Sequence, residues 1–233
     1  MDAPASHRIA ATIGATTPVY VYQWPVRFWH WVTTAAIVLL AATGWLIAHP
    51  ITGLGTGMVR LLHLVAGVLL GVGFLGRIYW AFVGNHHSRT IFFLPVWRRE
   101  FWKEIGEEMA WYGFRRKVPK RWVGHNPLAR AAMFGLFMLG TVLMIATGFA
   151  LWGEDVPGGL VQRSFGWVFW ILGPSSVVRA VHHLGMWILL CFSTVHIYFV
   201  IREDIMGRTS TVSAMIGGWR TVKDAGGDDL EDD

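Results

Sequence analysis

Residues 178–201 have the sequence VRAVHHLGMWILLCFSTVHIYFVI. Arg179 is the only Lys, Arg, Asp or Glu in this stretch, and a run of about 20 apolar residues is long enough to cross a bilayer as a helix. Three histidines interrupt the run, namely His182, His183 and His196. Ionisable groups are costly inside a membrane, so each of them is a candidate functional residue. The stretch therefore predicts a transmembrane helix that carries a function.

Three earlier stretches have the same character. They cover residues 26–49, 58–84 and 127–152, and with 178–201 we call them the first to fourth spans. Hydrophobic residues make up 54% of the 233 residues and charged residues 15%, which is typical of a lipid-embedded protein. The sequence thus predicts an all-α membrane protein, a four-transmembrane-helix bundle over residues 26–206. Because the preceding segment shows no cleavable signal peptide, the first span should itself direct insertion.

Basic residues are concentrated between the second and third spans. The nine in this loop are Arg89, Arg98, Arg99, Lys103, Arg115, Arg116, Lys117, Lys120 and Arg121. Those on the opposite side are chiefly Arg60, Arg163 and Arg179. By the positive-inside rule, loop 85–125 and both termini (1–25 and 207–233) are cytoplasmic, and loop 153–177 is external. The net charge of +5 therefore indicates topology, and no nucleic-acid partner is expected.

The two larger loops differ in composition. Within the cytoplasmic loop, residues 97–116 alternate bulky aromatic and charged side chains, which favours an interfacial helix on the membrane surface or a partner-binding helix. The external loop holds glycines, prolines and a short apolar patch, so a brief helix is compatible with it. The acidic string at residues 228–233 is most simply a solvated tail. We find no convincing internal repeat.

The histidines of the fourth span fall on two faces. At about 100° per residue, the 14 steps from His182 to His196 return to within about 40° of one face, whereas His183 points about 140° away from His196. His182 and His196 lie roughly 21 Å apart along the axis, at about 1.5 Å per residue. This separation leaves room for two stacked macrocycles, one near each side of the membrane.

Depth in the membrane identifies the partners of these two histidines. His30 of the first span lies at the cytoplasmic depth of His196, and His63 of the second span lies at the outer depth of His182. Two facing pairs of histidines in a helical bundle are what bis-histidine ligation of two b-type haems requires. The single cysteine, Cys191, and the absence of a C-x-x-C-H motif exclude covalent haem attachment. The alternative for each histidine is a hydrogen bond between helices.

Three arginines are candidate partners of haem propionates. Arg60 and Arg179 each precede an outer histidine by three residues and lie on its face of the helix. Arg77 follows His63 by 14 residues, so it lies near the same face at the depth of the inner haem. The alternative is that these arginines extend toward the membrane surface and only set the topology.

With these residues in place, the chain resembles the cytochrome b subunit of membrane-bound nickel-iron uptake hydrogenases. The matching stretches are PVRFWHW (25–31), RLLHLVAG (60–67), RIYWAFVGN (77–85), PVWR (95–98), GHNP (124–127), MFG (133–135), HLGMW (183–187) and REDIM (202–206). They cover most of the chain in order. A more distant resemblance is to the cytochrome subunit of formate dehydrogenases, which shares the four-helix di-haem plan.

The resemblance implies a set of ligands and partners. The haem-ligand positions of the family fall on His30, His63, His182 and His196, the four that helix geometry selects. The family implies a bacterial inner membrane protein of the respiratory chain, with an iron-sulfur small subunit, a nickel-iron large subunit and a quinone as electron acceptor. Hydrogen chemistry would belong to the partners, and this chain would reduce quinone.

The resemblance also implies a place for the quinone, beside the cytoplasmic haem near the start of the third span. The residues there are Gly124, His125, Asn126 and Arg130. His125 is a candidate proton donor because histidine ordinarily titrates near neutral pH, and the alternative is a polar cap on the helix.

Other functions stay open on the sequence alone. A cytochrome of a formate or thiosulfate oxidoreductase would keep both haems and differ only in its partner. A haem-free membrane anchor or a histidine-based metal transporter would bind no haem, although a transporter should carry acidic residues along its path and the four spans hold almost none.

Overall fold

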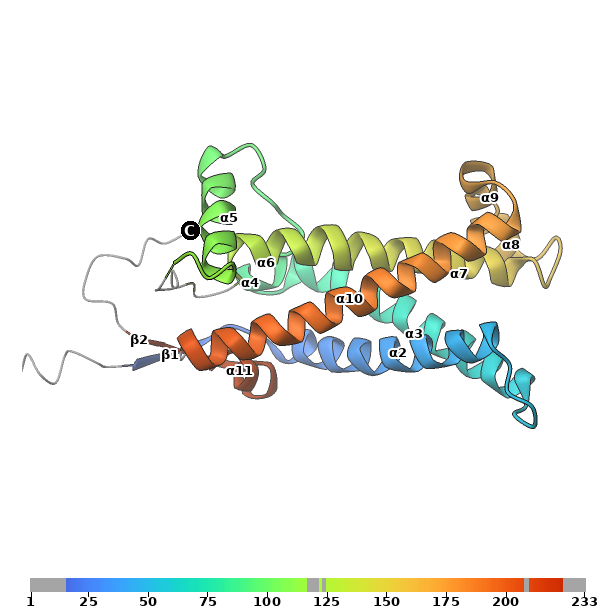
Figure 1. The fold of residues 1–233 in the computed structure, drawn as a ribbon, viewed down its shortest axis with the longest axis horizontal. Helices are drawn as coiled ribbons and strands as arrows, with labels where there is room; N and C mark the ends of the chain where they lie inside the picture. Colours follow the sequence, from blue (N-terminus) through green and yellow to red (C-terminus); the bar gives the residue numbers. More distant parts are fainter. Residues whose placement is uncertain (1–15, 117–121, 123–124, 208–209, 224–233) are drawn as a thin grey trace, which may run out of the picture.

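The computed structural model describes residues 16–116, 122, 125–207 and 210–223, and four long helices dominate it (Figure 1). These are α2 (Trp24–Ala48), α3 (Thr56–Val83), the continuous helix made of α6 (Pro127–Ala132), the π-helical turn η1 (Met133–Met138) and α7 (Leu139–Gly153), and α10 (Ser175–Gly207). All four are long and apolar enough to cross a membrane, which confirms the predicted multi-pass helical fold. Pro25 and Pro127 lie in the first turn of two of them, where a missing N–H does no harm.

The helices associate as two antiparallel pairs. Helix α2 packs along α3, and α7 packs along α10, whereas α3 touches α7 over a shorter stretch. The second pair is joined at its far end by the short helices α8 (Leu160–Phe165) and α9 (Trp167–Leu172), which lie at the right of Figure 1. We refer to α2 with α3 as the first helix pair and to α7 with α10 as the second. The space between the pairs positions the site described below.

Large apolar side chains cover the outside of the bundle. On α3, Val72 is 63% exposed and Leu75 and Phe82 are each 67% exposed. The interior is correspondingly small, and its main cluster is built on Phe74, Phe137 and Leu189 with a few neighbours. A water-soluble protein would bury such side chains, so the exposed apolar belt is a lipid-facing surface.

The end of the bundle opposite α8 and α9 is closed by a second layer. Helix α4 (His86–Arg89) follows α3, and α5 (Arg99–Tyr112) lies across the long axis of the bundle (Figure 1). Arg202 of α10 fastens α5, because its guanidinium donates to the carbonyl oxygens of Tyr112 at 2.9 Å and Trp111 at 3.0 Å. These carbonyls belong to the last turn of α5, where helix backbone oxygens lack partners and a cation is favoured.

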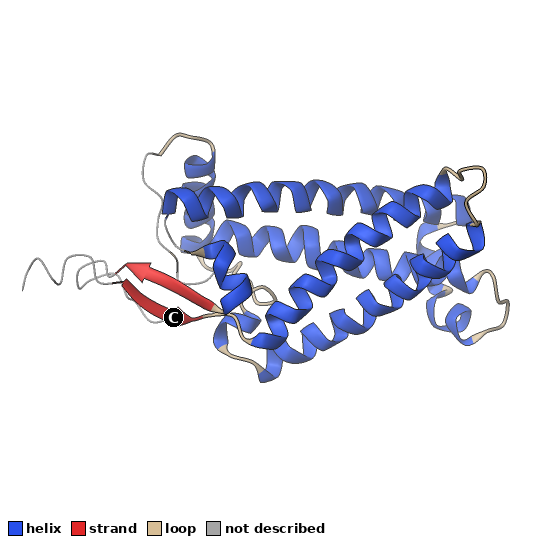
Figure 2. Cartoon of the chain, turned by 90° about the horizontal axis from the view of Figure 1, so that it is seen from below, coloured by secondary structure: helices blue, strands red, loops and turns tan. Residues whose placement is uncertain are grey.

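The two ends of the described chain meet in a strand pair. Strand β1 (Thr16–Tyr20) pairs antiparallel with β2 (Trp219–Lys223), and α11 (Thr211–Gly217) precedes β2 (Figure 2). This differs from the expectation of an all-α chain with polar ends. The pairing joins segments about 200 residues apart, and no local pattern in either one reports on the other. The acidic string at 228–233, together with Lys117, Lys120 and Arg121, lies outside the described residues.

Replacing Arg202 with leucine should loosen α5. The variant loses two charge-assisted hydrogen bonds and leaves two carbonyl oxygens without that donor, and each such bond contributes roughly 1.5–3 kcal/mol. We expect a lower unfolding temperature and faster proteolytic cleavage near α5 in the detergent-solubilised protein. Arg99→Leu, at an exposed arginine of α5 itself, is the matched control and should behave like wild type. Equal effects of the two substitutions would contradict this role of Arg202.

Candidate haem sites

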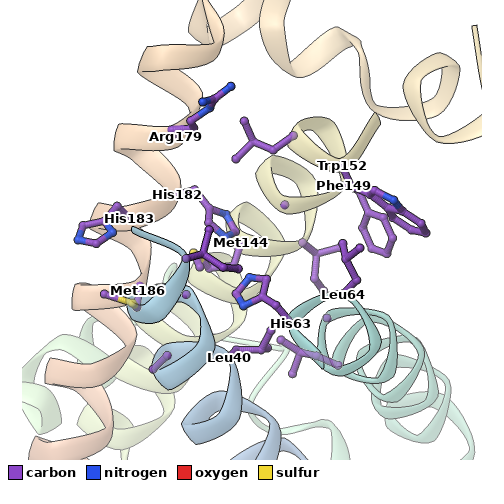
Figure 3. A pocket seen from close by; sticks show the side chains of 18 of the residues that line it. Leu40, His63, Leu64, Met144, Phe149, Trp152, Arg179, His182, His183 and Met186 are labelled. Atoms are coloured by element: carbon purple, nitrogen blue, oxygen red, sulfur yellow. The ribbon is translucent and has the colours of Figure 1, made fainter. Parts of the chain in front are cut away.

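The outer histidine pair faces across the gap between the two helix pairs. His63 of α3 and His182 of α10 have ring centroids 6.4 Å apart, with their planes inclined at 69°. Both rings line a cavity of about 570 Å³ whose walls come from α2, α3, α7 and α10. Figure 3 shows the two imidazoles pointing into this cavity among Leu40, Leu64 and Met144.

A threonine holds each ring of the outer pair. The Nδ1 atom of His63 lies 2.9 Å from Thr43 Oγ1, and the Nδ1 atom of His182 lies 2.7 Å from Thr147 Oγ1. Thr43 belongs to α2 and Thr147 to α7, so each hydrogen bond stays within one helix pair. The hydrogen bonds therefore occupy Nδ1 and leave Nε2 of each histidine available to a ligand.

A glycine beside each threonine makes room for the ring. A Cβ atom on Gly44 would lie 3.3 Å from Cε1 of His63, and one on Gly148 would lie 3.1 Å from Cε1 of His182. Both distances are tighter than ordinary van der Waals contact, so a side chain would push the imidazole aside. The two halves of the outer site thus repeat one arrangement, with a threonine and then a glycine on one helix and a histidine on its partner.

The inner histidine pair is held differently. His30 of α2 and His196 of α10 have ring centroids 6.5 Å apart, and the ring of Phe192 stacks on His196 at 5.7 Å with a plane angle of 14°. Nδ1 of His30 is buried and has no hydrogen-bond partner among the described residues. Aromatic rings therefore pack around the inner pair, and no hydroxyl group among the described residues bonds to either imidazole.

The spacing within each pair fits an iron ion bound between two imidazoles. A metal-nitrogen bond is about 2 Å long, and the ring centre lies roughly 1 Å behind the bonding nitrogen, so two imidazoles on one metal have centroids about 6 Å apart. Across the described residues, no group of three or more His, Cys, Asp or Glu side chains could hold a bare metal ion. Two histidines alone suit a metal that brings its own equatorial ligands, as porphyrin iron does.

A comparison with known families identifies the family of the chain. Residues 21–218 match the family model described as prokaryotic cytochrome b561. The chain belongs to this family. Membership implies a multi-pass membrane protein that binds b-type haem, and the matched range contains all four histidines of the two pairs.

Relatives of this cytochrome carry a consistent name. It is 49% identical over 217 residues to the probable Ni/Fe-hydrogenase B-type cytochrome subunit of Azotobacter chroococcum, covering 89% of this chain and 90% of the relative. A protein of the same name from Cupriavidus necator is 51% identical over 214 residues, with 88% of each chain covered. The probable Ni/Fe-hydrogenase 1 B-type cytochrome subunit of Escherichia coli K12 is 42% identical over 218 residues, covering 88% and 91%.

The fifth membrane histidine of the cytochrome takes a separate position. His183 also borders the cavity, but its ring packs edge-on against Trp187 at 6.3 Å. Figure 3 shows it on a different side of α10 from His182. A sequence-based choice between these adjacent histidines depends on helical phase alone, and the structure places only His182 opposite His63.

The three candidate arginines have different surroundings. Arg60 and Arg179 border the mouth of the outer cavity, where Arg179 forms an ion pair with Glu154 at 3.5 Å. Arg77 is only 3% exposed, and its guanidinium donates to the carbonyl oxygen of Ser88 at 2.6 Å. Its Nε and Nη1 atoms are buried without hydrogen-bond partners among the described residues. Arg77 therefore has donors free for an anion inside the protein.

The polar residues around the start of the third span mainly organise the backbone. Asn126 accepts a hydrogen bond from the N–H of Ala129 as a helix cap and donates to the Tyr112 hydroxyl at 3.0 Å. Arg130 donates to the carbonyl oxygens of Thr90 and Phe93. Gly124 lies outside the described residues. Asn126 and Arg130 thus tie the start of α6 to the segments around α4 and α5.

His125 does not have the near-neutral pKa that its residue type suggests. Burial, together with the positive charges of Arg220 and other nearby basic groups, lowers the pKa of His125 to about 3. The ring packs edge-on against Tyr22 at 5.7 Å. The imidazole is therefore neutral at physiological pH, so it offers a hydrogen bond rather than an acidic proton.

A search for ionisable residues does not find Thr43 and Thr147, but a short sequence repeat marks both. Ala-Thr-Gly followed by an aromatic residue occurs at residues 42–45 in the first span and again at 146–149 in the third. In the structure, both copies lie beside an outer histidine. This repeat is too short to be recognised as significant from the sequence alone.

The low pKa of His125 predicts a pH-dependent stability. An unfolded histidine takes a proton near pH 6.5, and the folded one does so only near pH 3. The neutral ring therefore stabilises the fold above pH 6.5, and this contribution falls by up to about 2 kcal/mol as the pH drops to 5. We expect the unfolding temperature of the His125→Gln variant in detergent to fall less than that of wild type between pH 7 and pH 5. Parallel pH profiles for the two proteins would contradict the low pKa.

Proposed function

We propose that this chain is the membrane-anchored cytochrome b subunit of a nickel-iron hydrogenase in the bacterial inner membrane. It would hold two b haems, accept electrons from an iron-sulfur small subunit on the outer face and deliver them to quinone. A nickel-iron large subunit would carry out the hydrogen chemistry. The names of the relatives support the hydrogenase partner.

The observation that carries the proposal is that two pairs of histidines face each other across the bundle. Each pair joins one helix pair to the other at a spacing that suits one iron. The two pairs lie roughly 21 Å apart along α10, at about 1.5 Å per residue. When bound, the haems supply one-electron carriers at these two depths. An electron entering at one side can thus cross most of the apolar layer within a single chain.

The residues around each pair support haem binding in different ways. His63 and His182 line the outer cavity, and Arg60 and Arg179, which also line it, would meet acidic propionates. At the inner site, Arg77 keeps two buried donors, and its guanidinium lies 5.5 Å from the ring centre of Trp29. A buried cation is costly without an anion, so a carboxylate of the inner haem would satisfy it.

The orientation in the membrane follows from charge. The described part of the basic loop 85–125 and the strands β1 and β2 lie at the end of the bundle opposite α8 and α9 (Figure 1). We assign the end with α5, β1 and β2 to the cytoplasm by the positive-inside rule. His63 and His182 are then the outer pair, next to the iron-sulfur partner, and His30 and His196 are the inner pair.

The quinone site is placed at the cytoplasmic start of α6. His125, Asn126 and Arg130 remain its proposed residues, with Asn126 and Arg130 acting by holding the backbone in place. A neutral His125 can donate a hydrogen bond to a quinone oxygen, and the proton itself would have to come from another group or from water.

Haem content tests the proposal directly. The complex purified with its native partner should contain two low-spin b haems per chain. His63→Ala and His182→Ala should each remove the same haem, because each removes one of the two histidines that would hold it. His183→Ala is the matched control and should retain both. One haem or none in fully intact wild-type complex, or loss of a haem in the His183 variant alone, would contradict the assignment.

The order of the two haems is testable in membrane vesicles supplied with hydrogen. His63→Ala should stop reduction of the inner haem, because the entry point is lost. His30→Ala should leave the outer haem reducible and stop quinone reduction. Difference spectra and quinone reduction rates report the two steps separately. Normal quinone reduction by a His30 variant that lacks the inner haem would rule out this order.

A further inference from the structure

We infer that Thr43 and Thr147 are positioning residues that set the protonation and the donor strength of the outer histidine pair, and thereby give the outer haem the lower reduction potential of the two. The inference rests on the proposed di-haem function. It concerns residues that bind no iron themselves and act through His63 and His182.

The hydrogen bonds of the Thr43 hydroxyl determine the tautomer of His63. Thr43 Oγ1 has one proton, which it donates to the carbonyl oxygen of Leu39 at 2.6 Å. Its oxygen can therefore only accept from the Nδ1 atom of His63, 2.9 Å away. Nδ1 must carry the ring proton, and Nε2 keeps the lone pair that a metal needs.

The hydrogen bonds of the Thr147 hydroxyl determine the tautomer of His182 in the same way. Thr147 Oγ1 donates its proton to the carbonyl oxygen of Leu143 at 2.7 Å and accepts from Nδ1 of His182 at 2.7 Å. Thr43 is 4% exposed and Thr147 is fully buried, so water cannot readily replace either hydroxyl. Both outer ligands are thus fixed in the metal-binding tautomer before any haem arrives.

The inner pair has no such support among the described residues. There, Nδ1 of His30 is buried without a hydrogen-bond partner, and the ring of His196 stacks on Phe192 without a hydrogen bond to a described residue. A hydrogen bond accepted from Nδ1–H makes the opposite nitrogen a stronger electron donor. Stronger donors favour ferric over ferrous iron, so the outer haem should have the lower potential and the inner haem the higher one.

The test is a redox titration of the purified holo-complex, read by haem absorbance. Thr43→Val and Thr147→Val keep the side-chain shape and remove the acceptor, whereas Thr43→Ser and Thr147→Ser keep the hydroxyl. Thr33→Val and Thr141→Val are matched controls, because these threonines are buried in the same helices and neither hydroxyl bonds to a histidine in the described chain. The outer-haem signal is the one that disappears in His63→Ala.

We expect the outer potential to rise in the valine variants, and to rise most when both are combined. Loss of such a partner changes metal affinity by about 10–100-fold, and a tenfold greater loss for ferric than for ferrous haem equals about 59 mV for one electron. The serine variants and both controls should keep the wild-type potentials. Loss of the outer haem in the valine variants alone, with the serine variants intact, would also support the inference.

Three results would overturn the inference. They are an unchanged outer potential in the double valine variant, equal shifts of both haems, and serine variants as defective as the valine variants. In each case, a wild-type complex with two haems would leave the proposed function standing. A wild-type complex with fewer than two haems would instead refute the proposed function itself.

Discussion

The architecture depends on histidines that face each other across the gap between two helix pairs. In lipid, apolar surfaces gain little by meeting each other, so packing and specific polar contacts must hold a bundle together. The pairs α2–α3 and α7–α10 are each closely packed, but contacts between them are sparse. A metal bound between His63 and His182, or between His30 and His196, would link one pair to the other. The cofactor would then be a structural cross-link as well as an electron carrier.

Much of this organisation could be predicted from the sequence because bilayer thickness and helical period constrain it. The lengths of the apolar spans predicted four helices. The helical phase of His182 relative to His183 distinguished the histidine that faces His63 from its neighbour. Thr43 and Thr147 could not be found this way, since a hydroxyl in a helix ordinarily bonds only its own backbone. The strands β1 and β2 were missed because their partners lie at opposite ends of the chain. That the histidines ligate haem remains a prediction.

Three cationic or basic residues near the α5 end of the bundle show how strongly surroundings modify residue type. Arg202 points its guanidinium at backbone carbonyls and aromatic rings, including Phe114 at 4.2 Å, so it serves the fold. Arg77 has one carbonyl partner and spare donors, which suits an anionic ligand. His125 gives up its charge because burial and neighbouring positive groups both oppose protonation. Residue identity alone would have grouped all three as cations.

Helix α10 contributes one histidine to each facing pair, and it is the last of the four long helices to be synthesised. Since chains are made from the N-terminus, neither pair can exist before this helix enters the membrane. If each pair holds a haem as proposed, a chain that stops before α10 would lack one histidine of both pairs and could retain neither haem. Strand β2 lies beyond α10 and pairs with β1, so this contact between the two ends of the described chain forms only after both histidines of α10 have been made. If the proposed haem sites are right, haem colour in a preparation therefore reports that synthesis has passed His196.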